Sequence, residues 1–274
     1  MVCAQEASPC LAVSRLRPVE TFMEPVFYAR PDGQAITLRS TPRLANWNRS
    51  GDSGAARLTR ALGFSEHLTD PRLAESSGPI ALRFDVGLPR SVRLLDERDL
   101  DNYVLPLTAH LAGRAPHPVV SVWGCKRYAD ETTLRIETAR PREDPDGEDE
   151  SVIALSLALS AVGRRDDFKA GFRREIHDQV AQQLSGADPL PDGPVVLEAS
   201  FVVGPTRDWL DLWWSTLDGL APLLGQSPSA PEFHPRDGRI VDLGLHCTVD
   251  PDLGSDVHIG LRVRPGWLDP APRT

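Results

Sequence analysis

The chain has 274 residues, of which 41% are hydrophobic and 25% are charged, so a packed core is expected and wholesale disorder is excluded. Thirty Lys and Arg residues against 39 Asp and Glu residues give a net charge of −9, which argues against broad, nonspecific nucleic-acid binding but leaves room for a local basic groove. No apolar run approaches the ~18 residues of a membrane span. The sequence does not open on a basic and then apolar leader, so we expect a cytoplasmic protein that does not cross a membrane.

The first half of the chain predicts alternating strands and helices. Strands are expected where apolar residues alternate, and helices where they recur every three or four residues. In chain order these are strands at residues 25–29 and 34–39, a helix at 55–67, a strand at 78–86, a helix at 99–111, and strands at 119–125 and 133–137.

The second half predicts elements in a similar order. They are a strand at 151–162, a helix at 167–184, a strand at 193–202, a helix at 208–220, and strands at 240–247 and 257–263. The helix at 167–184 carries an apolar stripe with a spacing of four residues, made of Phe168, Phe172, Ile176, Val180 and Leu184.

An acidic segment separates the two series. Residues 141–150 (PREDPDGEDE) contain six acidic residues and cannot bury a core, so they indicate a solvated linker. Because similar elements occur in the same order on both sides, the sequence predicts an internal duplication, with one unit at 20–140 and a second at 151–265.

The first half carries a recognisable motif. Asp99, Asp101 and Asn102 form D-x-D-N at the start of the expected helix, Val119 and Val120 open the next strand, and Lys126-Arg127-Tyr128 end it. This pattern resembles the RusA-like Holliday-junction resolvases. The helix lysine of that family falls on Leu105 here, and its later aspartate falls near Pro116.

The second half resembles the same family less completely. Asp208 matches the first aspartate of the motif, whereas the second falls on Leu210 and the asparagine on Asp211. Trp214 stands in place of the lysine, Asp218 fits the end of the helix, and Asp237 fits the late aspartate.

The resemblance implies an α+β fold in which two RusA-like units form an intramolecular pseudo-dimer, and it implies a Mg²⁺- or Mn²⁺-dependent endonuclease acting on branched DNA in recombination and repair. The implied catalytic residues are Asp99, Asp101, Asp208 and Asp237, and the implied metal ligands are these four together with Asp211. Carboxylates suit this role because Mg²⁺ prefers oxygen ligands. A D-x-D in extended chain would place both carboxylates on one face, and Asp208 and Asp211 would be neighbours in a helical turn.

Structural alternatives exist for each of these residues. Asp99 or Asp208 is also suited to capping the following helix, and Asp237 lies in a sequence typical of turns. Trp209, Trp213 and Trp214 favour a packing face over a base-stacking surface. His234, His246 and Cys247 lack the spacing of a tetrahedral metal site, whereas Arg90, Arg93 and Arg98 form either a phosphate-binding or a solvated loop.

Two functions therefore remain open. The first is a structure-selective endonuclease or nickase, which the paired Asp99 and Asp101 favour. The second is a non-catalytic RusA-like protein that binds nucleic acid or a protein partner, which the acidic composition favours.

Overall fold

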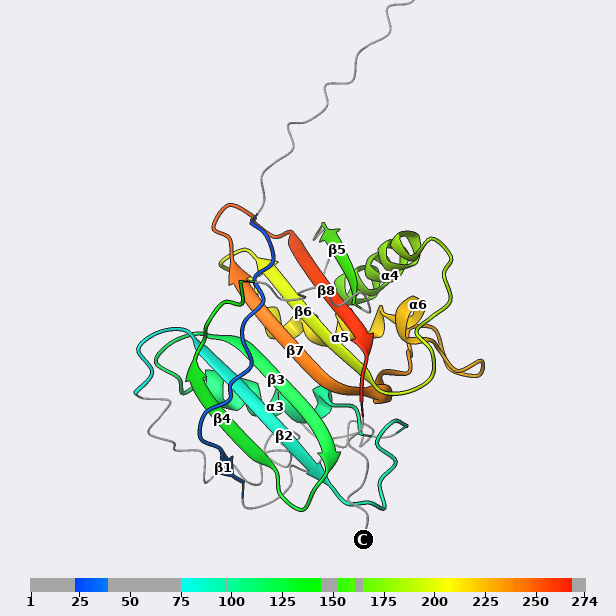
Figure 1. Cartoon of the computed structure of the whole chain (residues 1–274). Coiled ribbons are helices and arrows are strands. Elements are labelled where there is room, and N and C mark those ends of the chain that lie inside the picture. Colours follow the sequence, from blue (N-terminus) through cyan, green and yellow to red (C-terminus); the bar gives the residue numbers. More distant parts are fainter. Residues whose placement is uncertain (1–22, 39–74, 97, 144–151, 161–164, 268–274) are drawn as a thin grey trace, which may run out of the picture.

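One eight-stranded mixed sheet contains all the described strands of the computed structural model (Figure 1). The structure describes residues 23–38, 75–96, 98–143, 152–160 and 165–267. The strands are β1 (Ile36–Thr37), β2 (Ile80–Leu88), β3 (Val119–Tyr128), β4 (Thr133–Thr138), β5 (Ile153–Leu159), β6 (Val195–Val203), β7 (Ile240–Val249) and β8 (Val257–Pro265). The helices are α3 (Asp101–Ala112), α4 (Arg165–Leu184), α5 (Trp213–Asp218) and α6 (Ala221–Leu224), with the 3-10 helices η2 (Trp209–Leu212) and η3 (Asp237–Arg239). This arrangement confirms the α+β class.

The antiparallel pair of β3 and β7 lies at the centre of the sheet, whose order is β1-β4-β2-β3-β7-β6-β8-β5. On one side β2 is parallel to β3 and antiparallel to β4, and on the other β6 is parallel to β7 and antiparallel to β8. Both parallel pairs shift register after the first residue, Ile80 in β2 and Val195 in β6. Because β3 and β7 are antiparallel, the end of β3 lies beside the start of β7. Segments from both halves of the chain therefore meet where β3 ends and β7 begins, and we call this side of the sheet the edge at which β2 and β3 end.

Two residues of very different size face each other in this central pair. Trp123 of β3 is 3% exposed and pairs with Gly244 of β7. A Cβ atom on Gly244 would lie only 3.0 Å from Cζ3 of Trp123 and 3.1 Å from Nε2 of His246. The indole therefore occupies space that any side chain at position 244 would need, and this fit helps to fix how the two halves pair.

Helix α3 packs on one face of the sheet, against β2 and β3 (Figure 1). Its buried residues include Val104, Leu107 and Leu111, whose spacing of three and four places them on one side of the helix. Gly124 of β3 allows close approach, since a Cβ atom there would lie 2.7 Å from Cγ1 of Val104. This packing holds the start of α3 at the edge of the sheet where β2 and β3 end.

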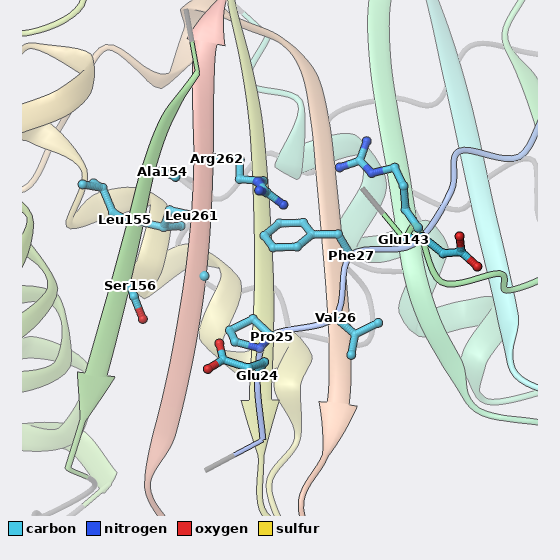
Figure 2. Close-up of a pocket in the computed structure, with 12 residues that line it drawn as sticks. Glu24, Pro25, Val26, Phe27, Glu143, Ala154, Leu155, Ser156, Leu261 and Arg262 are labelled. Carbon is cyan, nitrogen blue, oxygen red and sulfur yellow. The ribbon is translucent and has the colours of Figure 1, made fainter. Parts of the chain in front are cut away.

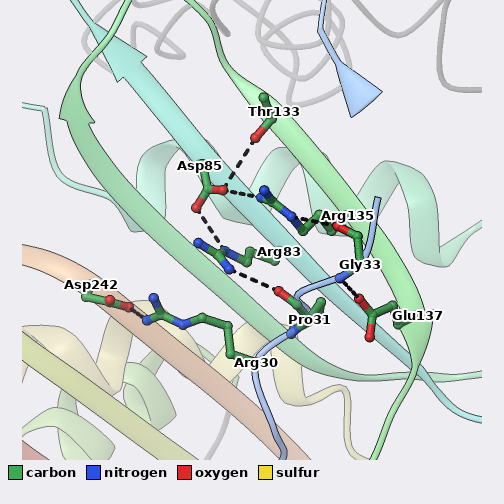
Figure 3. A network of polar contacts seen from close by, with 9 residues as sticks. All are labelled: Arg30, Pro31, Gly33, Arg83, Asp85, Thr133, Arg135, Glu137 and Asp242. Atoms are coloured by element: carbon green, nitrogen blue, oxygen red, sulfur yellow. Dashed lines mark hydrogen bonds and ion pairs between the residues drawn. The ribbon is translucent and has the colours of Figure 1, made fainter. Parts of the chain in front are cut away.

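Residues 23–38, here called the strap, cross the opposite face of the sheet (Figure 1). Arg30 pairs with Asp242 of β7, and the backbone N–H of Gly33 donates to Glu137 of β4 (Figure 3). The strap therefore contacts both halves of the sheet.

A buried carboxylate lies beneath the strap. Asp85 of β2 is 1% exposed and is held by Arg135 and by Nε of Arg83, which lies 2.9 Å from Oδ1 of Asp85, while the hydroxyl of Thr133 lies 3.4 Å from its Oδ2 (Figure 3). Arg83 also donates from Nη1 to the carbonyl oxygen of Pro31 in the strap, at 3.1 Å. The charge on Asp85 is thus compensated, as burial of an ionised carboxylate requires.

Two glutamines of α4 cover the outer edge of β5. Gln179 donates to the carbonyl oxygen of Ala158 at 2.7 Å and accepts from its N–H at 3.2 Å. Gln183 makes the same two bonds to Ser156, at 2.7 and 3.2 Å. The two amides therefore take the place of a neighbouring strand along an edge that would otherwise present unpaired backbone groups.

We expect the double variant Gln179→Ala and Gln183→Ala to lower the free energy of unfolding by about 1–3 kcal/mol, because four hydrogen bonds are lost. The exposed edge should also increase concentration-dependent association, measurable by light scattering alongside chemical denaturation. Gln182→Ala on the exposed side of the same helix is the matched control. The interpretation fails if the double variant behaves like this control.

Most expected elements of the described chain are present, with a few corrections. The expected strand at 25–29 is reduced to an isolated bridge between Tyr28 and Pro141, and the one at 34–39 to the two residues of β1. The expected helix at 208–220 is divided into η2 and α5. The expected helix at 55–67 lies outside the described residues, as does the Phe168 side chain. In the described part of the chain, no helix is long and apolar enough to cross a membrane.

Candidate active site

The D-x-D motif lies where the chain enters α3. Leu100, between the two aspartates, has φ −70° and ψ −33° and occupies the N-cap position, and Asp101 is the first residue of the helix. The expectation of an extended D-x-D is therefore wrong. Leu100 already has helical backbone angles, so Asp99 and Asp101 do not alternate as they would in a strand. The N-cap residue is Leu100, whose side chain makes no capping hydrogen bond, so Asp99 does not occupy the N-cap, and Asp101 is the acidic residue of the first turn.

The two carboxyl groups nevertheless influence each other. Asp101 is 7% exposed, and burial, followed by the negative charges of Asp99 and Asp218, raises its pKa to about 7. Burial also raises the pKa of Asp99, against the opposing effects of Lys126 and of Asn102, whose Nδ2 lies 3.3 Å from Oδ2 of Asp99. These are carboxylates that lack sufficient compensation when both are ionised.

Asp237, which the sequence assigned to the second half, belongs electrostatically to the same cluster. Burial raises its pKa to about 8, and the charges of Asp99, Asp101 and Asp218 contribute in that order. The cause is the antiparallel pairing of β3 and β7, which places η3 of the second half beside the end of β3. Asp99, Asp101 and Asp237 are called the acidic cluster below.

Lys126 links the two parts of the acidic cluster. It is 2% exposed, and its Nζ donates to the carbonyl oxygen of Arg98 at 3.0 Å and to that of Gly238 at 2.6 Å. One acceptor directly precedes Asp99 and the other directly follows Asp237. Burial lowers the pKa of Lys126 to about 8, although the charges of Asp99, Asp237 and Asp101 oppose the shift.

The backbone before Asp99 is strained. Arg98 has φ +70°, in the left-handed region that residues other than glycine rarely adopt. Such a conformation costs on the order of 1–3 kcal/mol and persists where surrounding contacts enforce it. The bond from Lys126 to the Arg98 carbonyl is one such contact.

A pocket of 430 Å³ opens beside the acidic cluster. Asp96 and Asp99 line it from the first half, and His234, Arg236 and Asp237 line it from the second. The carboxylates of Asp99 and Asp237 are thus accessible to a ligand.

The second D-x-D-like segment lies elsewhere and differs in character. Asp208 is exposed and caps η2, accepting a hydrogen bond from the N–H of Leu210 at 3.0 Å. Asp211 is exposed in the same short helix. The structure therefore supports the capping alternative for Asp208 and does not bring Asp208 or Asp211 to the acidic cluster.

Asp218 also acts on the acidic cluster, although its sequence context predicts only a position at the end of a helix. It lies at the end of α5, forms an ion pair with Arg173 at 3.0 Å, and has a pKa raised by burial. Its role could not be read from the motif, because α5 and the start of α3 come together only in the folded sheet.

Two of the candidate tryptophans and His246 have structural roles. Trp209 and Trp213 pack edge to face, with ring centroids 5.0 Å apart, which confirms the packing face for these two. His246 is fully buried on β7, and its Nδ1 lies 3.1 Å from the hydroxyl oxygen of Ser121. Among the described residues, no group of three or more His, Cys, Asp or Glu side chains is arranged so that it could hold a metal ion.

A second pocket, of 470 Å³, lies on the strap side of the sheet (Figure 2). Figure 2 shows Phe27 beside Arg262, whose guanidinium carbon lies 4.5 Å from the centre of the ring. The carboxylates in its lining belong to Glu24 and Glu143, and Leu155 and Leu261 contribute to its apolar part. This pocket is chemically unlike the acidic cluster.

No known protein-family model matches the sequence, and no curated protein matches it. A function for this protein is therefore inferred from the chemistry of the acidic cluster and from the motifs that carry the RusA-like resemblance.

Proposed function

We propose that this protein is a Mg²⁺- or Mn²⁺-dependent, structure-selective DNA endonuclease of the RusA-like type, built from two RusA-like units that form an intramolecular pseudo-dimer. The observation that carries the proposal is the acidic cluster. Asp101 is buried, Asp99 and Asp237 are half-buried and line a pocket, and burial, followed by the charge of Asp99, raises the pKa values of both Asp101 and Asp237. Clustered carboxylates with strongly shifted pKa values are typical of functional sites.

The two halves supply complementary parts of this cluster. The first unit has the D-x-D of Asp99 and Asp101 but has Pro116 near the position of the late aspartate. The second has the late aspartate, Asp237, but has Leu210 in its own D-x-D. Since the central strand pair places η3 beside the end of β3, each unit supplies what the other lacks, and the chain has one composite centre.

The donor chemistry fits a divalent cation. In the described structure these carboxylates do not stand in a metal-binding arrangement. Asp99, Asp101 and Asp237 would have to converge to hold the ion, and its charge would then relieve their mutual repulsion. Bound there, the ion supplies water activation and stabilisation of the charge that develops on the phosphate. The chain itself positions the carboxylates through Lys126 and the packing of α3. Because the pKa values of Asp101 and Asp237 are raised, ion binding should release protons near neutral pH.

One centre per chain predicts nicks rather than paired cuts. Four-way junctions, flaps and duplexes labelled on individual strands should be incubated with the protein and Mg²⁺ or Mn²⁺. We expect single-strand nicks in branched substrates, lost in Asp101→Asn and in Asp237→Asn. The matched control Asp208→Asn with Asp211→Asn should retain activity, because these residues lie outside the acidic cluster. Coordinated double incision by the wild type would contradict the single centre.

A non-catalytic role is the second candidate, favoured by the acidic composition with its net charge of −9. In that case the protein would bind branched DNA or a protein partner through the same edge of the sheet. Junction binding without cleavage by the wild type, in the presence of Mn²⁺, would support this role and oppose the endonuclease.

A further inference from the structure

An exposed aromatic ring lies among arginines at the edge of the sheet that carries the acidic cluster. Tyr128, the last residue of β3, is 41% exposed. The guanidinium carbon of Arg90 lies 5.7 Å from the centre of its ring. Arg93 and Arg127 are exposed nearby in the chain. These four residues are called the platform below.

The platform is fixed to the candidate site by hydrogen bonds at two points. Tyr128 donates from its hydroxyl to the carbonyl oxygen of Val92 at 3.1 Å. Lys126, two residues earlier on β3, holds the carbonyl oxygen of Arg98. Residues 89–96 therefore lie between the platform and the acidic cluster, and Leu95 and Asp96 line the same pocket as Asp99.

We infer that the platform binds an unpaired DNA strand and leads it toward the acidic cluster; this inference rests on the proposed function and specifies its substrate. An exposed ring can stack on a base only where that base is not already stacked and paired in a duplex. Arg90 over the ring adds a second planar group suited to stacking. Arg93 and Arg127 supply positive charge for the phosphates that flank the stacked base.

Charge also limits the path of the strand. Asp130 and Glu131 are exposed in the turn directly after Tyr128, where they would repel phosphates. Arg90 and Arg93 lie on the other side of the ring, in residues 89–96, which continue to the pocket. Arg93 also pairs there with Asp96, at 3.3 Å. A branched substrate would place its unpaired arm on the platform and its junction beside the acidic cluster.

Binding should be measured by fluorescence anisotropy in EDTA, with a short labelled DNA strand, its duplex, and the RNA strand of the same sequence. We expect the single DNA strand to bind more tightly than the other two. Tyr128→Ala should weaken its binding about tenfold, as expected for loss of one stacked base. Tyr128→Phe, which keeps the ring and loses the bond to Val92, should bind like the wild type.

The arginines are tested by the salt dependence of binding. For a single strand, the slope of log K against log salt concentration falls by ~0.7 for each phosphate contact that is removed. Arg93→Gln with Arg127→Gln should therefore reduce the slope by about 1.4. Arg140→Gln is the control, because Arg140 is exposed after β4, at the opposite edge of the sheet.

Equal or tighter binding of the duplex, tighter binding of the RNA strand, or unchanged affinity of Tyr128→Ala would each overturn the inference. The Asp99→Asn and Asp101→Asn double variant keeps the platform and should bind the strand at least as tightly as the wild type. Strand binding without any cleavage by the wild type in Mn²⁺ would contradict the endonuclease and leave the platform standing. Cleavage of branched DNA that is unchanged in Tyr128→Ala would contradict the platform and leave the endonuclease standing.

Discussion

Asp99→Asn together with Asp101→Asn is expected to make the metal-free protein more stable at pH 8, on the order of 2–4 kcal/mol. Asp101 is almost fully buried, and its pKa of about 7 shows that the folded protein disfavours its charge. An amide has a similar shape and carries no charge, so the repulsion within the acidic cluster falls. Chemical denaturation of both proteins in EDTA measures the difference.

The raised pKa of Asp101 also determines how the free energy of unfolding depends on pH. The ordinary pKa of Asp101 is 3.8, so between about pH 4 and pH 7 the folded state holds a proton that the unfolded state has lost. Folding then takes up a proton, and the free energy of unfolding must fall as pH rises through this window. Asp237, with a pKa of about 8, extends the fall to higher pH. The wild type should lose stability from pH 5 to pH 8, and the double variant should lose less, because the burial of Asp237 still raises its pKa.

A divalent ion should offset the destabilising repulsion between the ionised carboxylates of the acidic cluster in the wild type, but not in the Asp99→Asn and Asp101→Asn variant. Mn²⁺ at ten to a hundred times its Kd would add about 1.4–2.7 kcal/mol to the free energy of unfolding by mass action. The double variant should gain little. As a matched control, Asp208→Asn with Asp211→Asn should respond to Mn²⁺ like the wild type, because asparagine can keep the cap at position 208. Destabilisation of the Asp99 and Asp101 variant at every pH would instead show that these carboxylates support the fold.

Local patterns in the sequence were sufficient for most of the sheet. Strands such as β2 and β6 are nearly continuous apolar runs opened by Gly-Pro, and their ends were predicted to within a few residues. The start of α3 was harder, because the choice between an extended and a helical Leu100 depends on how the helix packs against Gly124.

The composition of the candidate site could not be predicted, because it depends on long-range pairing. Register between β3 and β7 joins residues more than a hundred positions apart, and no local period encodes it. One signal was present nonetheless: the first half lacks a late aspartate and the second has one, Asp237, without a complete D-x-D. Such complementary gaps are a reason to expect a shared site in any duplicated chain. Lys126, by contrast, could be identified from the sequence only as part of the K-R-Y motif. Its role in the site could not be predicted, because its hydrogen-bond partners are backbone carbonyl oxygens.

Lys126→Met is expected to be the most damaging single substitution in the candidate site, lowering the free energy of unfolding by about 3–5 kcal/mol at pH 7.5, the range for removing one partner of a buried charge cluster. Methionine is unbranched like lysine and only one heavy atom shorter, so the loss reflects mainly chemistry rather than a cavity. The carbonyl oxygens of Arg98 and Gly238 lose their donor, and the acidic cluster loses a buried cation.

The electrostatic part of this loss can be separated from the rest. At pH 5 the carboxyl groups of Asp101 and Asp237 are largely protonated in the folded state, so the cost of Lys126→Met should shrink toward that of two lost hydrogen bonds, about 1–3 kcal/mol. Adding Asp101→Asn and Asp237→Asn to Lys126→Met should recover stability at pH 7.5 and show coupling in a mutant cycle. A cost that is small, or equal at both pH values and unaffected by these changes, would mean that Lys126 does not hold the two halves of the acidic cluster together.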